Sequence, residues 1–161
     1  MSSKVPVVRQ VSWPLVIPQL LAMVIAIVTI ELIIRPATFY LSILWGVGIF
    51  LVYSSGSRLL LGRAQRQGMQ LTKSGKYQEA IAAFEKSYQF FSRFDWIDRY
   101  RFVTLMNPSA MGYREMALIN IGSCYVQLGK KAEAREYYEK ALAEFPQSEL
   151  ARNNLKILGT S

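Results

Sequence analysis

The chain of 161 residues contains no histidine and a single cysteine, Cys124. Without histidine, a serine or cysteine nucleophile has no imidazole base to activate it, so hydrolases of the Ser-His-Asp and Cys-His kinds are excluded. Zinc sites that combine cysteine with histidine are excluded for the same reason. One cysteine forms no internal disulfide, and its place beside Tyr125 in a helical pattern predicts a packed thiol.

Glycine-rich phosphate loops are also missing, because Gly46 and Gly48 lie inside an apolar stretch that suits helix packing. The acidic residues of the C-terminal half alternate with lysine and arginine, as at Glu136, Glu139 and Lys140, which is typical of a solvated helix face. We therefore expect no enzyme activity, no catalytic residues, no metal site and no cofactor.

Charge is scarce in the first sixty residues, where 10–30 and 36–57 contain no charged side chain. Each stretch is close to the roughly 20 residues that a helix needs to cross the apolar core of a bilayer. The sequence therefore predicts a transmembrane hairpin within 1–57, with helices at about 12–34 and 36–55. A cleaved signal peptide is less favoured, because no small-residue cleavage site follows and a second apolar stretch comes at once. A re-entrant hairpin that enters from one side stays open as an alternative.

Basic residues near the helix ends predict the orientation of this hairpin. Arg35, partly offset by Glu31, lies between the two apolar stretches. The other side carries five basic residues, namely Lys4, Arg9, Arg58, Arg63 and Arg66. We therefore expect an integral membrane protein with two spanning helices, whose termini both lie on the cytoplasmic face of a bacterial inner membrane or of an organelle equivalent.

The net charge of +8 is concentrated next to these helices. Residues 58–94 contain seven lysines and arginines against two glutamates, a balance of +5, whereas residues 115–161 contain six basic and six acidic residues. Anionic headgroups attract basic charge placed where a chain leaves the bilayer. A nucleic-acid site would instead place a basic surplus on the distal domain. We expect the lipid bilayer as a partner and no nucleic acid.

Beyond the apolar stretches, a regular pattern of small and bulky residues occupies 115–148. Ala134, Tyr138 and Ala141 recur at intervals of four and three, which places them on one stripe of a helix. The full pattern comprises Leu118, Ile121, Gly122, Tyr125, Leu128, Gly129, Ala134, Tyr138, Ala141 and Pro146. This part of the chain resembles the tetratricopeptide repeat (TPR), a helix–turn–helix unit of about 34 residues.

A weaker copy precedes it at 61–94. Ala64 and Gln67 depart from the pattern there, because large apolar residues are expected at these positions of the first helix. The copy keeps the offsets of Gly68, Leu71, Gly75, Tyr77, Ala80, Phe84 and Ser87. Two copies are fewer than a solenoid needs to bury its faces, so we expect 149–158 to form a capping helix.

About 20 additional residues, 95–114, separate the two copies, because their equivalent glycines lie 54 positions apart. Asp95 as N-cap and Asn107-Pro108 as a stop predict a short helix at 96–106. Its aromatic residues fill the core, bind a partner or lie against the bilayer, and all three interpretations stay open. The predicted fold class is thus all-α: a two-helix transmembrane hairpin, followed at 58–161 by a short TPR-like solenoid with an inserted helix and a capping helix.

TPR proteins typically bind a segment of another protein in their concave groove, and many serve as assembly scaffolds. The resemblance therefore implies a membrane-anchored adaptor that binds a protein or peptide at the cytoplasmic face and would suit the assembly of a membrane complex. The alternative is a structural subunit held by its hairpin, with the TPR part as a rigid cap. The predicted partner-binding residues are Arg63, Gln67, Trp96, Arg99, Tyr100, Arg101, Arg114, Asn120, Ser123 and Gln127.

Overall fold

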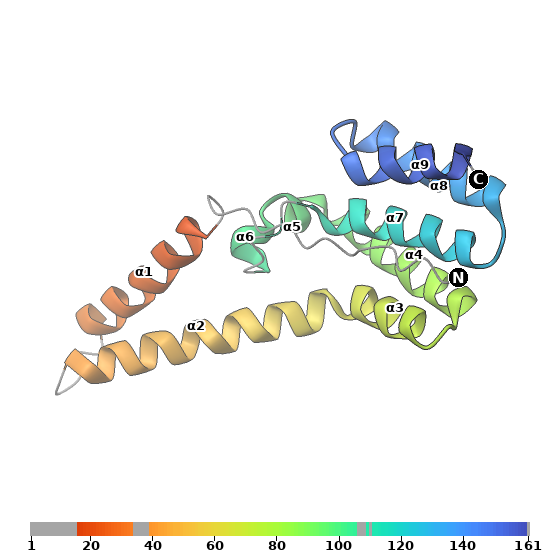
Figure 1. Ribbon diagram of the computed structural model, residues 1–161. Helices are drawn as coiled ribbons and strands as arrows, with labels where there is room; N and C mark the ends of the chain where they lie inside the picture. The colour runs from red at the N-terminus through yellow and green to blue at the C-terminus, as the bar shows by residue number, and fades with distance from the viewer. Residues whose placement is uncertain (1–15, 34–38, 106–108, 110, 161) are drawn as a thin grey trace.

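The computed structural model describes residues 16–33, 39–105, 109 and 111–160, and these form nine helices. Two long helices, α1 and α2, project from a helical domain that contains the others (Figure 1). The described part of the chain is therefore all-helical, as the sequence predicts. The bounds are α1 Ile17–Ile33, α2 Phe39–Leu61, α3 Arg63–Lys73, α4 Tyr77–Arg93, α5 Asp95–Arg99, α6 Arg101–Thr104, α7 Tyr113–Gln127, α8 Lys131–Glu144 and α9 Glu149–Thr160.

Helices α1 and α2 pack against each other as a hairpin. Gly46 of α2 allows the close approach, because a Cβ atom there would lie 2.5 Å from Ile27 Cγ1 of α1. The Ser42 hydroxyl donates a hydrogen bond to the Glu31 carboxylate, so these two polar groups of the hairpin satisfy each other. Gly48, by contrast, has nothing within 4 Å of the place where its Cβ would stand.

The bounds of this hairpin differ from the prediction. Helix α2 runs on to Leu61 instead of ending near residue 55, because serine and glycine within 54–58 weaken a helix without breaking it as proline would. Helix α1 begins at Ile17, and residues 12–15 lie outside the described residues. Lys4, Arg9 and Arg35, on which the predicted orientation partly depends, also lie outside them.

Two helical hairpins, α3–α4 and α7–α8, turn in the same way. In the first, the Lys76 amide donates to the Leu71 carbonyl, and Gly75 between them has a φ of 74°. In the second, the amide of the residue after Gly129 donates to the Tyr125 carbonyl, and Gly129 has a φ of 75°. A glycine in the left-handed region that ends a helix in this manner satisfies carbonyls of its last turn.

Replacing Gly129 with alanine is expected to lower the free energy of unfolding by about 1–2 kcal/mol, because a Cβ strains the left-handed conformation. No atom lies within 4 Å of that Cβ position, so the effect would be conformational rather than steric. Gly159→Ala is the matched control, since Gly159 also faces open space but lies within helix α9. Urea unfolding of the full chain in mild detergent, followed by circular dichroism, measures both; an equal effect of the two substitutions would contradict the expectation.

The two hairpins have the same internal packing, and helix α7 of the second hairpin makes the main contact with the first. A Cβ at Gly68 would lie 2.6 Å from Phe84 Cε1, and one at Gly122 would lie 2.6 Å from Tyr138 Cε1. Glycine in the first helix thus admits an aromatic ring from the second helix at the same offset in both hairpins. Helix α7 packs on α4 and on α8, whereas α9 covers the far side of α8.

The thiol of Cys124 lies at the contact between the hairpins and is 1% exposed. Its Sγ is 3.6 Å from the Thr72 hydroxyl of α3. Burial raises the pKa of this thiol, an effect that the contact with Thr72 partly opposes. Cys124 is therefore a packed residue of the core rather than a nucleophile.

The insertion departs from the predicted single helix at 96–106, because it forms two short helices with a break at Tyr100. The predicted N-cap is also wrong: Phe94 occupies that place, and the Asp95 carboxylate pairs with Arg99 at 3.4 Å instead. The break lets α5 turn Ile97 into a small core with Phe91. Asn107-Pro108, the predicted stop, lies outside the described residues.

Candidate partner-binding site

Helix α7 begins with a cap that comes from the insertion. Its N-cap residue, Gly112, has no side chain, and the carboxylate of Asp98 in α5 takes the role. Asp98 Oδ1 accepts from the Tyr113 amide at 2.7 Å, and Oδ2 accepts from the Arg114 amide at 3.0 Å. A Cβ at Gly112 would stand 2.9 Å from Asp98 Oδ2, so glycine is what lets the carboxylate approach. The insertion is thus fixed to the second hairpin.

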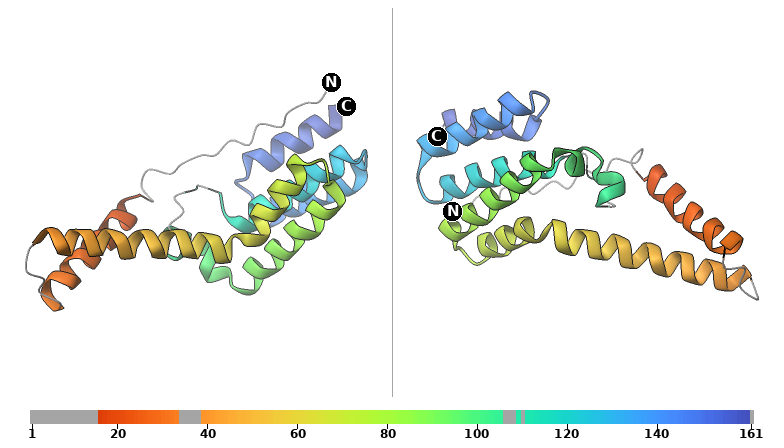
Figure 2. Two further views of the ribbon diagram at one scale, coloured as in Figure 1. Left: turned by 90° about the horizontal axis from the view of Figure 1, so that it is seen from below. Right: turned by 180° about the vertical axis from the view of Figure 1, so that it is seen from behind.

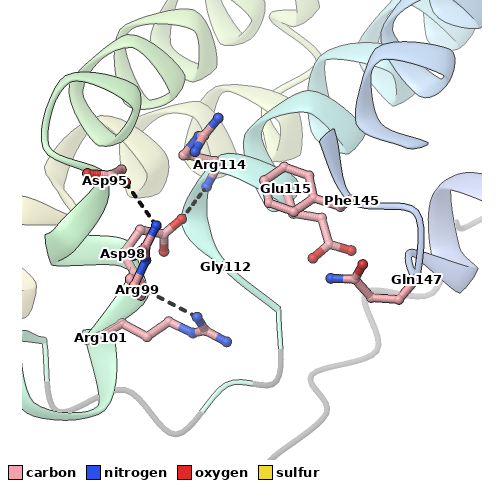
Figure 3. A pocket seen from close by; sticks show the side chains of 9 residues that line it. All are labelled: Asp95, Asp98, Arg99, Arg101, Gly112, Arg114, Glu115, Phe145 and Gln147. Carbon is pink, nitrogen blue, oxygen red and sulfur yellow. Dashed lines mark hydrogen bonds and ion pairs between the residues drawn. The ribbon is translucent and has the colours of Figure 1, made fainter. Parts of the chain in front are cut away.

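This junction opens into a cleft of about 260 Å³ between α5–α6, the start of α7 and the segment after α8 (Figure 3). It contains three of the predicted partner-binding residues, Arg99, Arg101 and Arg114. Figure 3 shows Arg101 on one wall and Glu115 on the other. The complete lining is Asp95, Asp98, Arg99, Arg101, Gly112, Arg114, Glu115, Phe145 and Gln147.

The arginines of this cleft differ in how firmly they are held. Arg101 donates from Nε to the Ser109 carbonyl at 3.0 Å and from a terminal nitrogen to the Asp98 carbonyl at 3.1 Å. Arg114 pairs with Glu144 at 2.6 Å, and its guanidinium lies 5.6 Å from the centre of the Phe145 ring. Arg99 is the exposed one, with a side chain that is 71% accessible. The cleft therefore offers a fixed polar wall and one adaptable cation.

Glu115 is the titratable group that this cleft perturbs. Burial raises the pKa of its carboxyl, and nearby Asp98 adds to the rise, whereas a hydrogen bond with Ser148 and the charge of Arg101 oppose it. A carboxyl whose pKa is higher in the folded chain favours folding while it is protonated. This contribution to the free energy of unfolding is lost as the pH rises from the pKa of the carboxyl in the unfolded chain through its higher pKa in the folded chain.

Glu115→Gln is therefore expected to raise the unfolding midpoint relative to the native chain at pH 7 to 8, because the amide carries no buried charge. The difference should shrink as the pH falls below the ordinary pKa of a glutamate, about 4.3, because the native carboxyl is then protonated in both states. Thermal unfolding of both chains across this pH range provides the measurement. A variant less stable than the native chain at pH 8 would show that the ionised carboxylate is stabilised in place.

Two further predicted residues, Arg63 and Gln67, line a separate cleft of about 350 Å³ where α2 meets α3 and α4. Leu60 and Phe90 supply its apolar wall. Ser87 is 1% exposed and lines it too, and its hydroxyl has no hydrogen-bond partner within the described ranges. This cleft is distinct from the one at Arg101, so the predicted site residues do not form a single groove.

Besides Arg114, the three other residues predicted on the first helix of the second copy have different surroundings. The Asn120 amide faces α3, with Nδ2 3.8 Å from Met69 Sδ. The Ser123 hydroxyl donates to the Ile119 carbonyl and lies 3.1 Å from Tyr138 Oη, so it faces into the hairpin rather than outward. Gln127 is exposed at the end of α7. Their contact with a partner stays a prediction.

Two aromatic residues of the insertion are on its surface. Trp96 is 54% exposed and Tyr100 is 51% exposed, whereas Ile97 between them is buried. The sequence did not indicate a role for Asp98, which caps α7 at this cleft, or for Glu115, which lines it. The only local signal for Asp98 was a glycine, Gly112, at the point where a capping side chain was due.

In its architecture, this part of the chain is a stack of helical hairpins of the α-solenoid type. Proteins of this class use their extended surfaces to bind other proteins. Residues 116–148 match the tetratricopeptide repeat family, which confirms the resemblance predicted for this segment. The TPR is a non-catalytic protein-interaction fold, in agreement with the expectation that the chain is not an enzyme. Comparisons with curated proteins and with solved structures gave no match.

Proposed function

We propose that this protein is a membrane-anchored TPR adaptor that binds a protein partner at the cytoplasmic face and assists the assembly of a membrane complex. One observation carries the proposal: a TPR is joined to two apolar helices whose large side chains are mostly exposed. Helix α2 has over Tyr40–Leu61 the length and composition of a membrane-crossing helix, and α1 is apolar over 17 residues.

The exposed side chains of these helices support the anchor. The largest exposures include Ile33 at 76%, Val52 at 75% and Leu44 at 68%. Contiguous apolar surface of this kind is unfavourable in water and favourable in hydrocarbon. At about 1.5 Å per residue, the 17 residues of α1 span roughly 26 Å, near the lower limit for crossing. The Ser42–Glu31 hydrogen bond pairs polar groups within the hairpin, as the interior of a membrane requires.

The matching turns of the two hairpins support a second TPR at 61–94, followed by the insertion 95–114, the repeat 115–148 and the capping segment 149–158. Within that domain, the cleft at Arg101 and the exposed surface of Gln127 are the candidate contacts for the partner. The polar wall of this cleft, which includes the guanidinium of Arg101, suits a peptide segment that carries acidic groups.

Crosslinking in native membranes tests this assignment. A photoreactive residue in place of Gln127 should capture a defined partner, and one in place of Glu139, which is exposed on α8, should not. In a second variant, Arg101→Glu should weaken the capture at position 127 if acidic groups of the partner enter the cleft. Equal capture from positions 127 and 139 would contradict the proposed surface.

The alternative is a structural subunit held through its hairpin. Gly48 favours it to a degree, because this position faces open space and leaves room for another helix, whereas Gly46 is already covered by α1. A chain that ends at residue 61 should then still enter the complex. Its failure to do so, with the full chain present in the complex, would favour the adaptor.

A further inference from the structure

Three aromatic side chains in and beside α5 are partly exposed to solvent. Ile97 packs with Phe91, whereas Trp96 is 54% exposed, Tyr100 is 51% exposed and Phe94, just before α5, is 37% exposed. The core interpretation therefore leaves about half of the surface of Trp96 and Tyr100, and about a third of that of Phe94, unexplained. Amphipathic rings such as tryptophan and tyrosine favour the boundary between water and hydrocarbon.

This face lies where the apolar hairpin joins the domain. Helix α6 contacts α1, and Leu61 at the end of α2 packs on the cluster of Phe91 and Ile97. Figures 1 and 2 show α5 and α6 at the end of the domain from which α1 and α2 project, with α8 and α9 at the opposite end. A bilayer that holds the hairpin would therefore have its headgroup layer at the level of α5 and α6.

The basic side chains around these rings are of the kind that a layer of anionic headgroups attracts. Arg93 is exposed, with its guanidinium 5.5 Å from the centre of the Phe94 ring. Arg99 is exposed as well, and its pair with Asp95 is a surface pair of little strength. Residues 58–94 carry seven basic residues against two acidic ones. Basic side chains next to anionic headgroups contribute about 1 kcal/mol each.

We propose that residues 93–100 dock on the bilayer surface, with Phe94, Trp96 and Tyr100 in the headgroup layer and Arg93 and Arg99 at the phosphates of anionic lipids. The proposal rests on the proposed membrane hairpin and adds to it a second, interfacial contact. Its consequence is orientation, because the domain is then held at its α5 end while α8 and α9 point away from the bilayer.

The test is the lipid exposure of Trp96 in the full chain. Trp13→Phe and Trp45→Phe leave Trp96 as the sole tryptophan. In vesicles of phosphatidylcholine and phosphatidylglycerol in equal parts, its emission should shift to shorter wavelength relative to detergent. Lipids brominated near the headgroup should quench it more strongly than lipids brominated at the chain ends. Quenching by aqueous iodide without quenching by either lipid would overturn the proposal.

Two control chains make the outcome specific. A chain with Trp45 alone reports the hairpin and should be quenched by deeply brominated lipids, so lipid quenching of Trp45 but not of Trp96 would refute this inference and leave the anchor intact. Loss of both signals would refute the anchor itself. Glu139→Trp in a chain without the native tryptophans should show no lipid quenching, because position 139 lies on the distant α8.

The arginines are tested by Arg93→Gln and Arg99→Gln in the chain with Trp96 alone. Each should lower the docking equilibrium about fivefold in vesicles that contain phosphatidylglycerol. Neither should change it in pure phosphatidylcholine. Equal effects in the two lipids would contradict the assignment of the arginines to anionic headgroups.

Discussion

Replacing Phe84 with alanine is expected to lower the free energy of unfolding by about 3–5 kcal/mol. Phe84 is 1% exposed and packs with Ile121 and Cys124 of α7, at the contact between the two hairpins. Its ring also fills the space over Gly68. The substitution therefore leaves a cavity that both hairpins line, and neither hairpin can close it without losing its contact with the other. Urea unfolding of the full chain in mild detergent measures the loss.

The partner of this ring provides a matched test. Gly68→Ala places a Cβ 2.6 Å from Phe84 Cε1 and should cost about 1–3 kcal/mol through overpacking. Combined with Phe84→Leu, it should cost less than the sum of the two single substitutions, because the smaller side chain makes room. Additive losses would mean that the two positions are not in contact. Glu139→Ala, on the exposed face of α8, is the control for a change without burial.

Asp98→Ala is expected to cost about 2–4 kcal/mol, the second largest effect, because it leaves two amides of the first turn of α7 without an acceptor. Asp98 is 6% exposed, and its two oxygens accept from Tyr113 and Arg114. The substitution should destabilise both the start of α7 and the junction between α5 and α7, since this carboxylate joins the insertion to the second hairpin.

Hydrogen exchange distinguishes this cap from a general packing effect. In Asp98→Ala, the amides of Tyr113 and Arg114 should exchange faster, while those of α3 and α4 keep their relative protection. Asp98→Asn should lie between the native chain and Asp98→Ala, because the amide keeps one acceptor oxygen. Unchanged exchange at Tyr113 in Asp98→Ala would show that the cap does not hold the helix.

The elements that local sequence determines were the predictable ones. Gly75 and Gly129 mark their turns because few other residues enter the left-handed region at low cost. Gly68 and Gly122 mark close helix contacts because each stands at a fixed offset from an aromatic residue. The departure at Ala64 and Gln67 also has a physical reason: α3 contacts α2, α4 and α7 but has no preceding repeat in the described chain to pack on.

The features that depend on partners distant in sequence could not be predicted. Asp98 caps a helix that begins 15 residues later, and nothing in its own segment shows that its acceptors are needed there. The break at Tyr100 lies beside it, and after the break Leu105 joins Ile97 and Phe91 in a core that only the folded chain brings together. The contact of the Ser123 hydroxyl with Tyr138 is of the same kind, because only the folded hairpin brings these two residues near.

The anchoring of this TPR by two membrane crossings is tested most directly by the sidedness of the connection between α1 and α2. With Cys124→Ala as background, Ser3→Cys, Ala37→Cys and Ser161→Cys each place one thiol in the full chain. In bacterial spheroplasts, a membrane-impermeant maleimide should label position 37 and spare positions 3 and 161, and in inside-out vesicles the pattern should reverse. Labelling of position 37 from the same side as position 3 or position 161 would contradict two crossings and, with them, the proposed anchor.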